Sequence, residues 1–182
     1  MKKWTTKSST YLYKTDFGNL RKDVCVLPNG FVINDYYVNE YVDWVNAVVI
    51  TRDNKIVLVK QYRYAGDDFF LEVPAGKIEQ GESLEEGILR EVREETGFTS
   101  DVSPIKLGEF FVNPATQTNK VASFLITDAY QNSNQQLDST EEIEVALFDF
   151  DEFEKLFKDN QISIQLFTVT AYYLAKSRLG GN

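Results

Sequence analysis

The sequence of 182 residues contains no histidine and only one cysteine, Cys25. The absence of histidine excludes Ser-His-Asp and Cys-His nucleophilic mechanisms and histidine-ligated zinc centres. A single cysteine excludes a disulfide framework and a cysteine zinc site within one chain. Cys25 lies in the apolar run VCVL, so we expect a small buried side chain. Any acid–base or metal chemistry must therefore come from carboxylates.

The sequence also has little positive charge and no long apolar run. Its 19 Lys and Arg residues stand against 28 Asp and Glu residues, which gives a net charge of -9. Because proteins that bind nucleic acid phosphates usually carry a basic patch, we do not expect nucleic acid as a partner. The N-terminus has no stretch of signal-peptide length, and no window approaches the ~18 apolar residues of a membrane helix. We expect a soluble, cytoplasmic protein with no membrane partner.

The first 42 residues have the alternation of β-strands. Strand-like runs cover 10–16, 20–27 and 31–38, and Pro28-Asn29-Gly30 forms a turn between the last two. The pattern predicts a small antiparallel sheet at 1–42, followed by a larger domain at 43–182. With 43% apolar residues, the chain can bury one good core.

The larger domain begins with runs of strand character. The segments 44–51 and 56–64 form a predicted hairpin around Asp53-Asn54-Lys55, with strands buried on both faces. One further short strand is predicted within 69–76, ended by Pro74 and Gly76, and three more are predicted at 105–112, 121–127 and 144–150. The segment 131–140 has the composition of a polar loop.

Three helices are predicted in this domain. The first covers 83–95, with Ser83 and Glu86 as a capping box and Gly97 as its stop. A short helix begins near Asp151, and a longer one covers 163–178. The apolar stripe of the first helix comprises Leu84, Ile88, Leu89 and Val92, and that of the last comprises Leu166, Val169, Tyr173 and Leu174. Together these elements predict an α/β sandwich around a mixed sheet, preceded by a small antiparallel β appendage.

The first helix carries three carboxylates on one face. Glu91, Glu94 and Glu95 stand at positions i, i+3 and i+4, where like charges repel. A divalent cation would relieve that repulsion, and hard oxygen donors favour Mg²⁺ or Mn²⁺. The alternative is a solvated acidic helix face in which Arg90 pairs with Glu94. Two features favour the metal site: a loop bounded by glycines precedes the helix, and the opposite stripe is apolar.

The segment Gly76–Phe98 resembles the Nudix box at every constrained position. After Gly76 come five residues and Glu82, then seven residues and Arg90-Glu91-Val92; one residue further stand Glu94-Glu95, and after another come Gly97 and Phe98. The resemblance implies an α/β/α sandwich, with residues 43–182 as the Nudix hydrolase domain. It also implies Mg²⁺, or Mn²⁺, held by Glu91, Glu94, Glu95 and the backbone carbonyl of Ala75. Arg90 would orient the glutamates and Glu82 would support them, while Gly76 and Gly97 would be structural.

The residues before the box, 60–79, resemble the ADP-ribose pyrophosphatase branch, which has a QYR segment and an E-x-P-A-G approach. By that resemblance Arg63 would bind a substrate phosphate; the alternative is a surface salt bridge. Glu72 would hydrogen-bond substrate or buttress the metal loop. Pro114, 16 residues after Phe98, matches a proline of ADP-ribose hydrolysing members, although Asn-Pro-Ala replaces the usual Ser-Pro-Gly. The substrate therefore stays open.

Two further roles follow from this branch. A loop before a late strand supplies an acidic residue, which predicts Glu141 or Glu142 as general base or further metal ligand. The alternative is a pair of solvated loop glutamates, and Ser139 stands where the family has another acid. In relatives, adenine stacks on aromatic rings supplied partly by a partner subunit, which suggests Tyr37 and Trp44; the alternative is that these rings pack in the core or an interface. Because a three-stranded sheet of this size is poorly stable alone, we expect a homodimer formed through the N-terminal region.

The preferred function is Mg²⁺-dependent hydrolysis of a nucleotide sugar, with ADP-ribose giving AMP and ribose 5-phosphate. Alternatives with the same chemistry are GDP-mannose, another nucleoside diphosphate derivative or a nucleoside triphosphate. A noncatalytic nucleotide-sugar sensor is a further alternative, which the intact box disfavours.

Overall fold

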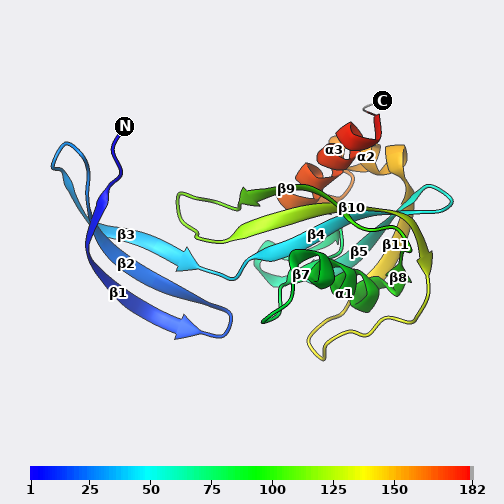
Figure 1. Cartoon of the computed structure of the whole chain (residues 1–182), viewed down its shortest axis with the longest axis horizontal. Coiled ribbons are helices and arrows are strands. Elements are labelled where there is room, and N and C mark those ends of the chain that lie inside the picture. The colour runs from blue at the N-terminus through cyan, green and yellow to red at the C-terminus, as the bar shows by residue number, and fades with distance from the viewer. Residues whose placement is uncertain (181–182) are drawn as a thin grey trace. The chain divides into compact units, whose positions relative to one another are not determined.

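The computed structural model describes residues 1–180 of the chain (Figure 1). These residues form two compact units. One unit comprises Met1–Asp43 together with Phe110–Val121, and the other comprises Trp44–Glu109 and the chain from Ala122 onward.

The first unit is built on a three-stranded antiparallel sheet, as the alternation predicted. Its strands are β1 (Thr5–Thr15), β2 (Gly18–Val26) and β3 (Val32–Glu40), in the order β1-β2-β3. The turn at Pro28–Gly30 is closed by Leu27 N–H donating to the Phe31 carbonyl at 2.9 Å, and Gly30 has φ 87°. Cys25 is buried, as expected.

Segment 110–121 completes the first unit. Asn39 of β3 donates its N–H to the Thr116 carbonyl at 2.8 Å and accepts at its own carbonyl from Thr118 N–H at 3.2 Å. Pro114 is exposed in the turn that this segment makes. The sheet buries little of its surface within the chain, since every residue of β1 is exposed.

The second unit contains a mixed sheet with three α-helices. Its strands are β4 (Trp44–Thr51), β5 (Lys55–Arg63), β6 (Asp68–Glu72), β7 (Ala75–Lys77), β8 (Phe98–Thr99), β9 (Ile105–Phe111), β10 (Lys120–Gln131), β11 (Glu144–Asp149) and β12 (Ser163–Ile164). The helices are η1 (Tyr64–Gly66), α1 (Leu84–Thr96), α2 (Phe150–Lys158) and α3 (Leu166–Gly180). The main strand order is β12-β6-β5-β4-β10-β8, and β12 runs parallel to β6.

The short strand predicted before Pro74 is β6, which ends at Glu72, and a second short strand, β7, follows the proline. β6 pairs with β5, whereas β7 pairs with β4. Pro74 lies between them and lacks the N–H that a continuous ladder would need. Its carbonyl still accepts from Ala47 N–H at 3.1 Å. The break turns the chain toward α1 and delivers Ala75 and Gly76 to the site.

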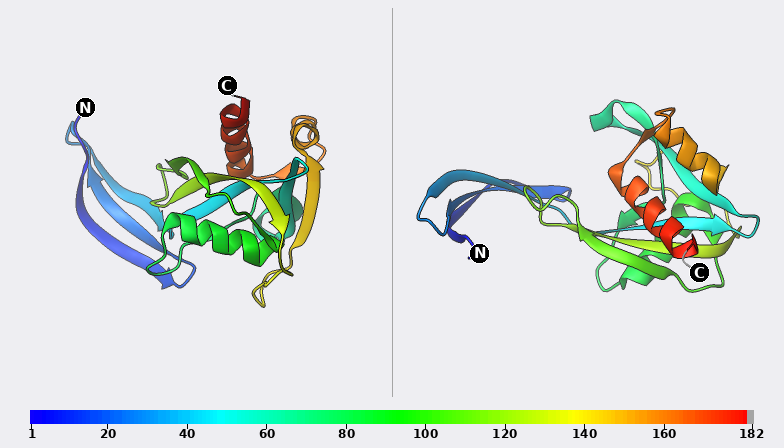
Figure 2. Two further views of the ribbon diagram at one scale, coloured as in Figure 1. Left: turned by 45° about the vertical axis from the view of Figure 1, so that its right-hand side comes forward. Right: turned by 90° about the horizontal axis from the view of Figure 1, so that it is seen from above.

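Strand β4 is buried on both faces, as its apolar density predicted. Val45, Ala47 and Val49 belong to the core under α1. Val48 and Ile50 belong to the opposite core, under α2 and α3. Each such buried side chain contributes about 1.5–3 kcal/mol. Figure 2 shows α1 on one face of the sheet and α2 with α3 on the other, which is the expected α/β/α sandwich.

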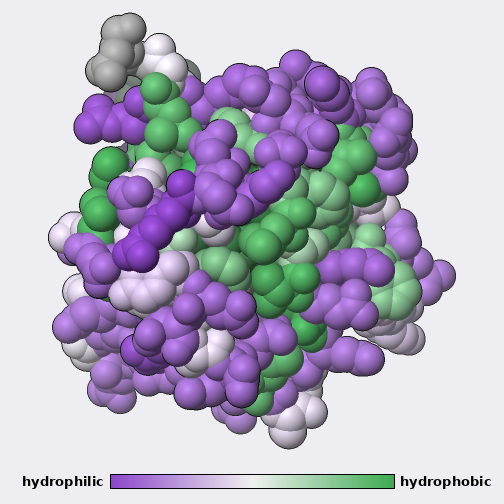
Figure 3. Space-filling model, turned by 90° about the vertical axis from the view of Figure 1, so that its right-hand side faces the viewer, coloured by the Kyte–Doolittle hydropathy of each residue, from purple (hydrophilic) through white to green (hydrophobic). Residues whose placement is uncertain are grey.

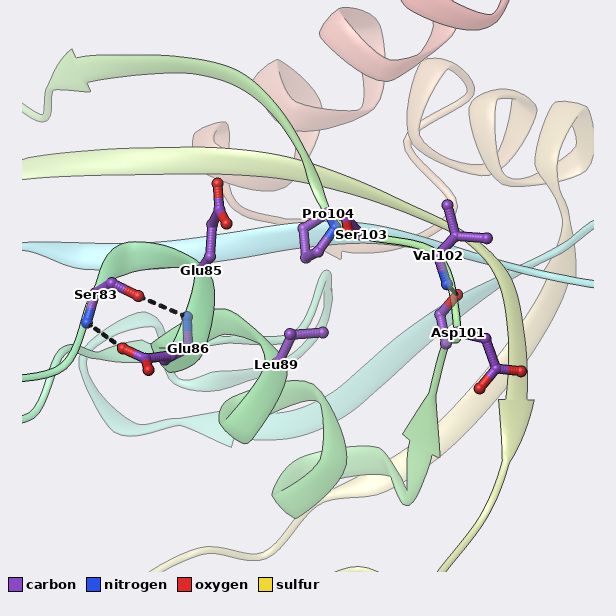
Figure 4. A pocket seen from close by; sticks show the side chains of 9 residues that line it. Ser83, Glu85, Glu86, Leu89, Asp101, Val102, Ser103 and Pro104 are labelled. Atoms are coloured by element: carbon purple, nitrogen blue, oxygen red, sulfur yellow. Dashed lines mark hydrogen bonds between the residues drawn. The ribbon is translucent and has the colours of Figure 1, made fainter.

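Helix α1 has the predicted ends. The Ser83 hydroxyl accepts from Glu86 N–H at 3.2 Å, and Ser83 N–H donates to the Glu86 carboxylate at 2.9 Å (Figure 4). At the other end Gly97 has φ 74°, and its N–H donates to the Arg93 carbonyl. Of the predicted apolar stripe, Ile88 and Val92 are fully buried, while Leu84 and Leu89 are partly buried against the same core.

The last helix differs from its prediction in both its start and its buried face. Residues 163 and 164 form β12, and α3 begins at Leu166. Its buried residues are Thr168, Ala171, Tyr172 and Ala175, whereas Leu166 is 74% exposed. The small alanines let the helix approach the sheet, and Tyr172 stacks on Phe150 with ring centroids 4.4 Å apart. Aromatic packing against α2 therefore decides the rotation of α3, which periodicity alone does not specify.

Some apolar side chains of the second unit are exposed, among them Tyr62, Phe69 and Leu147. Figure 3 shows an apolar strip between hydrophilic areas on one face of the molecule. None of the helices found between residues 1 and 180 has the length and apolar character needed to cross a membrane.

Candidate active site

Arg90 is the centre of the polar face of α1. Its Nε and Nη2 donate to the two carboxylate oxygens of Glu82, at 2.9 and 3.0 Å. Its Nη1 donates to Glu91 at 2.9 Å and to Glu94 at 3.0 Å, and Nη2 also reaches the Lys77 carbonyl at 2.9 Å. The hydrogen bond from Arg90 lowers the pKa of Glu82. Arg90 thus holds the loop before the helix and two of the three helix glutamates in one arrangement.

Glu95 is the most buried acid of the cluster, with 4% exposure. One of its carboxylate oxygens accepts from the Ala75 N–H at 3.0 Å. Burial raises the pKa of Glu95 from its ordinary value of 4.5 to about 8, and the charges of Glu91 and Glu141 act in the same direction. Arg63 partly opposes this effect. A negative charge at Glu95 is therefore poorly compensated by the protein.

Glu91 packs directly over the backbone of Gly76. A Cβ atom added to Gly76 would lie 2.0 Å from the carboxylate carbon of Glu91, so a side chain here would displace that carboxylate. Burial raises the pKa of Glu91, while its hydrogen bond to Arg90 opposes the rise. The close approach explains in physical terms why a glycine stands at the start of the loop.

The donor set fits a hard divalent cation. All candidate ligands are carboxylate or backbone oxygens, and two carboxylates are held partly desolvated where a positive charge would stabilise them. Within residues 1–180, however, no three acidic side chains are already arranged as a set of metal ligands. Arg90 occupies oxygens of Glu91 and Glu94, so a cation would compete with this guanidinium for them.

Arg63 and Glu72 form a buried ion pair. Arg63 Nε and Nη2 donate to the two oxygens of Glu72 at 2.9 and 2.5 Å, and Glu72 is 2% exposed. Glu72 also accepts from Gln165 at 2.7 Å and from Gln61 at 3.3 Å. The hydrogen bond to Glu72 raises the pKa of Arg63, as do the charges of Glu95 and Glu141. The fork of Arg63 is thus fixed beside the glutamate cluster, and sequence analysis did not identify either glutamine.

The loop after β10 docks on the C-terminal end of α1. Asn132 and Ser133 donate their N–H groups to the Gly97 carbonyl at 2.9 and 3.2 Å, and Gln136 N–H donates to the Glu94 carbonyl at 2.8 Å. A Cβ at Gly97 would lie 2.2 Å from the Ser133 carbonyl oxygen. Gly97 therefore ends the helix and also leaves space for this loop, which composition had marked only as polar.

The same loop carries Glu141 toward the cluster. Glu141 is exposed, and its charge acts on Glu91, Glu95 and Arg63. A turn holds it locally, since Asp138 N–H donates to the Glu141 carboxylate at 3.0 Å. Glu142 is also exposed. Of the two candidate bases, Glu141 is the one whose charge acts on these groups, and its role as a base stays a prediction.

The candidate adenine contacts lie on different strands. Trp44 is half-buried at the start of β4, opposite Lys77 in the register with β7. Tyr37, on β3, is 47% exposed. Their roles stay predictions.

Two hollows in the second unit lie apart from the glutamates. One, of about 400 Å³, is lined by Glu85, Leu89 and Asp101 (Figure 4). By helical spacing, Glu85 and Leu89 lie on the side of α1 away from the cluster of Glu91, Glu94 and Glu95. The other, of about 780 Å³, is lined by Lys60, Phe148 and neighbouring residues. Neither holds the residues of the candidate site.

Comparison with protein families gives two matches. The NUDIX domain profile matches residues 42–168. The profile described as the nucleoside diphosphate sugar hydrolase N-terminal domain matches residues 4–39. The matched ranges together cover both the site and the N-terminal sheet.

Individual proteins are also similar to this chain. An ADP-ribose pyrophosphatase of Bacillus subtilis (strain 168) is 31% identical over 137 residues, which span 75% of this chain and 73% of that protein. A methanol dehydrogenase activator of Bacillus methanolicus is 29% identical over 156 residues, spanning 85% of this chain and 83% of that protein. A solved structure titled "Crystal structure of ADP compounds hydrolase" has a TM-score of 0.85 at 20% identity, covering 100% of this chain and 96% of that chain. This last likeness shows the fold.

Proposed function

The chain belongs to the Nudix hydrolase family, and we propose that it hydrolyses the diphosphate bond of a nucleotide sugar, with ADP-ribose giving AMP and ribose 5-phosphate. The observation that carries the proposal is the acidic face of α1. There, Glu95 is buried with its charge poorly compensated, beside Glu91 and within reach of the Glu141 charge.

Glu91, Glu94 and Glu95, with the Ala75 carbonyl, are the residues we assign to the cation, and Mg²⁺ is the proposed ion with Mn²⁺ as a substitute. When bound, a divalent cation neutralises diphosphate charge, polarises phosphorus and lowers the pKa of an attacking water. Arg90 and Glu82 keep the helix glutamates and the loop in place. The Gly76 position lets the loop backbone lie against Glu91.

Glu141 and Arg63 act on the water and the diphosphate in this proposal. Glu141 accepts the proton of the attacking water from a loop position that is open to solvent. Arg63 presents its guanidinium to a substrate phosphate, and Glu72 fixes the plane of that group through two hydrogen bonds. The attacked phosphorus forms a new bond to the water oxygen while its bond to the bridging oxygen breaks, and the leaving phosphate keeps the bridging oxygen.

A substrate panel tests the proposed activity. With Mg²⁺, we expect kcat/KM for ADP-ribose to exceed that for GDP-mannose, diadenosine polyphosphates and nucleoside triphosphates by about tenfold or more. The rate is measured by separating the nucleotide product, AMP in the case of ADP-ribose, from the substrate by chromatography. Arg63→Lys, run on the same panel, should raise KM because a lysine cannot bind a phosphate through two parallel hydrogen bonds. Faster hydrolysis of another compound would reassign the substrate, and no hydrolysis of any would refute the activity.

A homodimer formed through the N-terminal sheet is part of the proposal. Several aromatic side chains of that unit are exposed, including Tyr11, Tyr13, Phe17 and Tyr37. A partner subunit would cover Tyr11, Tyr13 and Phe17, while Tyr37 and Trp44 stay the proposed adenine contacts. Light scattering at micromolar concentration should give twice the chain mass of 20.9 kDa. A monomeric mass would contradict the dimer without affecting the assignment of the glutamates.

A further inference from the structure

Gln135 joins three parts of the site through one side-chain amide. Its Nε2 donates to the Glu95 carbonyl at 2.6 Å and to the Ile143 carbonyl at 3.1 Å. A primary amide has two N–H donors, so both are used. One of them satisfies a carbonyl at the C-terminal end of α1, where the helix itself offers no partner.

One acceptor belongs to α1, and the other lies just beyond the segment that carries Glu141. Gln136 N–H anchors the start of this segment to the Glu94 carbonyl at 2.8 Å. Ile143, just beyond Glu142, is buried at 7% exposure and marks the end of the segment. Residues 137–142 are therefore closed into a short loop whose two ends are tied to each other and to α1 by Gln135.

Glu95 is held at both its backbone and its side chain. Its carboxylate accepts from Ala75 N–H, and its carbonyl accepts from Gln135. The residue that we assign to the cation and the loop that supplies Glu141 thus share one hydrogen-bonding partner. A displacement of the loop would move Glu141 relative to Glu95.

We propose that Gln135 is a positioning residue for hydrolysis: by tying residues 137–142 to α1, it fixes Glu141 relative to the helix that carries Glu91 and Glu95. The inference rests on the proposed function, because it assigns Gln135 an effect through Glu141. It goes beyond the box, which ends 37 residues earlier in the chain at Phe98. Without the amide, the loop retains its turn at Asp138 but loses the tie between its ends.

The first test compares Gln135→Ala with the matched control Gln136→Ala, in which the neighbouring residue keeps its backbone hydrogen bond to Glu94. For ADP-ribose with Mg²⁺, Gln135→Ala should lower kcat by about 10- to 100-fold with KM changed little. The control should keep wild-type kcat. If Gln135→Ala does not fold, Gln135→Glu has the same shape without the donors and should show the same loss. Wild-type kcat in the folded variant overturns the proposal.

A double-variant cycle separates positioning from general stability. Because Gln135 acts through Glu141, adding Gln135→Ala to Glu141→Gln should lower kcat by less than about twofold further. An equal loss in both backgrounds would show that Gln135 acts elsewhere, and would overturn the proposal.

Hydrogen exchange supplies a readout that does not depend on substrate. Amides of residues 137–142 should exchange faster in Gln135→Ala than in wild type and in Gln136→Ala, with α1 unchanged. Unchanged exchange of these amides in Gln135→Ala would contradict the inference that the Gln135 amide ties the loop to α1. If exchange rises but wild-type protein hydrolyses no nucleotide sugar, the proposed function fails while this inference stands.

Discussion

Replacing Glu95 with glutamine is expected to lower kcat for ADP-ribose by about two to four orders of magnitude, since metal-ion catalysis supplies several kcal/mol and each tenfold corresponds to about 1.4 kcal/mol. Glutamine keeps an oxygen that can accept from Ala75 N–H at the 3.0 Å contact but removes the negative charge. The fold should persist, so circular dichroism should match wild type while initial rates of AMP release fall.

The matched control for this variant is Glu85→Gln. Glu85 lies on the same helix, is exposed, and lines the hollow on the side opposite the cluster. Its neutralisation removes an equal charge from α1 and should leave kcat within about twofold of wild type, as is usual for surface substitutions. Near-normal turnover in Glu95→Gln, or an equal loss in Glu85→Gln, would remove the basis for assigning the helix face to metal-assisted hydrolysis.

The metal-free protein should lose stability as pH rises from 5 to 9. The pKa of Glu95 is raised by burial from 4.5 to about 8, so the folded state binds more protons than the unfolded state between these values. The contribution of Glu95 to the free energy of unfolding is therefore complete below pH 4.5 and is lost as the pH rises toward 8. The slope is at most about 1.4 kcal/mol per pH unit in this window. Urea unfolding in the presence of a chelator measures it.

Two comparisons isolate the contribution of Glu95. The free energies of unfolding of Glu95→Gln and of wild type should approach each other as pH falls toward 5, because the wild-type carboxyl is neutral there. Mg²⁺ should stabilise wild type more at pH 8 than at pH 5, because the ligands must be ionised to bind it. A wild-type pH profile parallel to that of Glu95→Gln would contradict the raised pKa, and Mg²⁺ without effect at pH 8 would contradict the assigned ligands.

Local features of the sequence predicted the elements that depend on near neighbours. Ser83, Glu86 and Gly97 determine the ends of α1 through hydrogen bonds within or next to the helix. The apolar density of β4 predicted burial on both faces, and the cores on its two sides confirm this. The resemblance to the Nudix box predicted the family, and the match over residues 42–168 confirms it.

Other features depend on residues far apart in the sequence, which no local pattern specifies. The bonds from Gln61 and Gln165 to Glu72 join residues 11 and 93 positions away. The buried face of α3 is determined by packing of Tyr172 on α2 rather than by the position of its leucines. Likewise, the polar composition of residues 131–140 gave no sign that this loop docks on α1, because its bonds use mostly backbone groups.

Because Gly97 and Ser133 are in contact, the sequences of these two segments should not change independently of each other in evolution. Any side chain at position 97 would meet the Ser133 carbonyl, so the shape of a loop 36 residues later limits the choice at the helix end. Among homologous chains, we therefore expect substitutions at the position of Gly97 to occur together with insertions or deletions at the positions of 132–136. A survey of such chains in which the two changes occur independently would show that the loop can dock in another way.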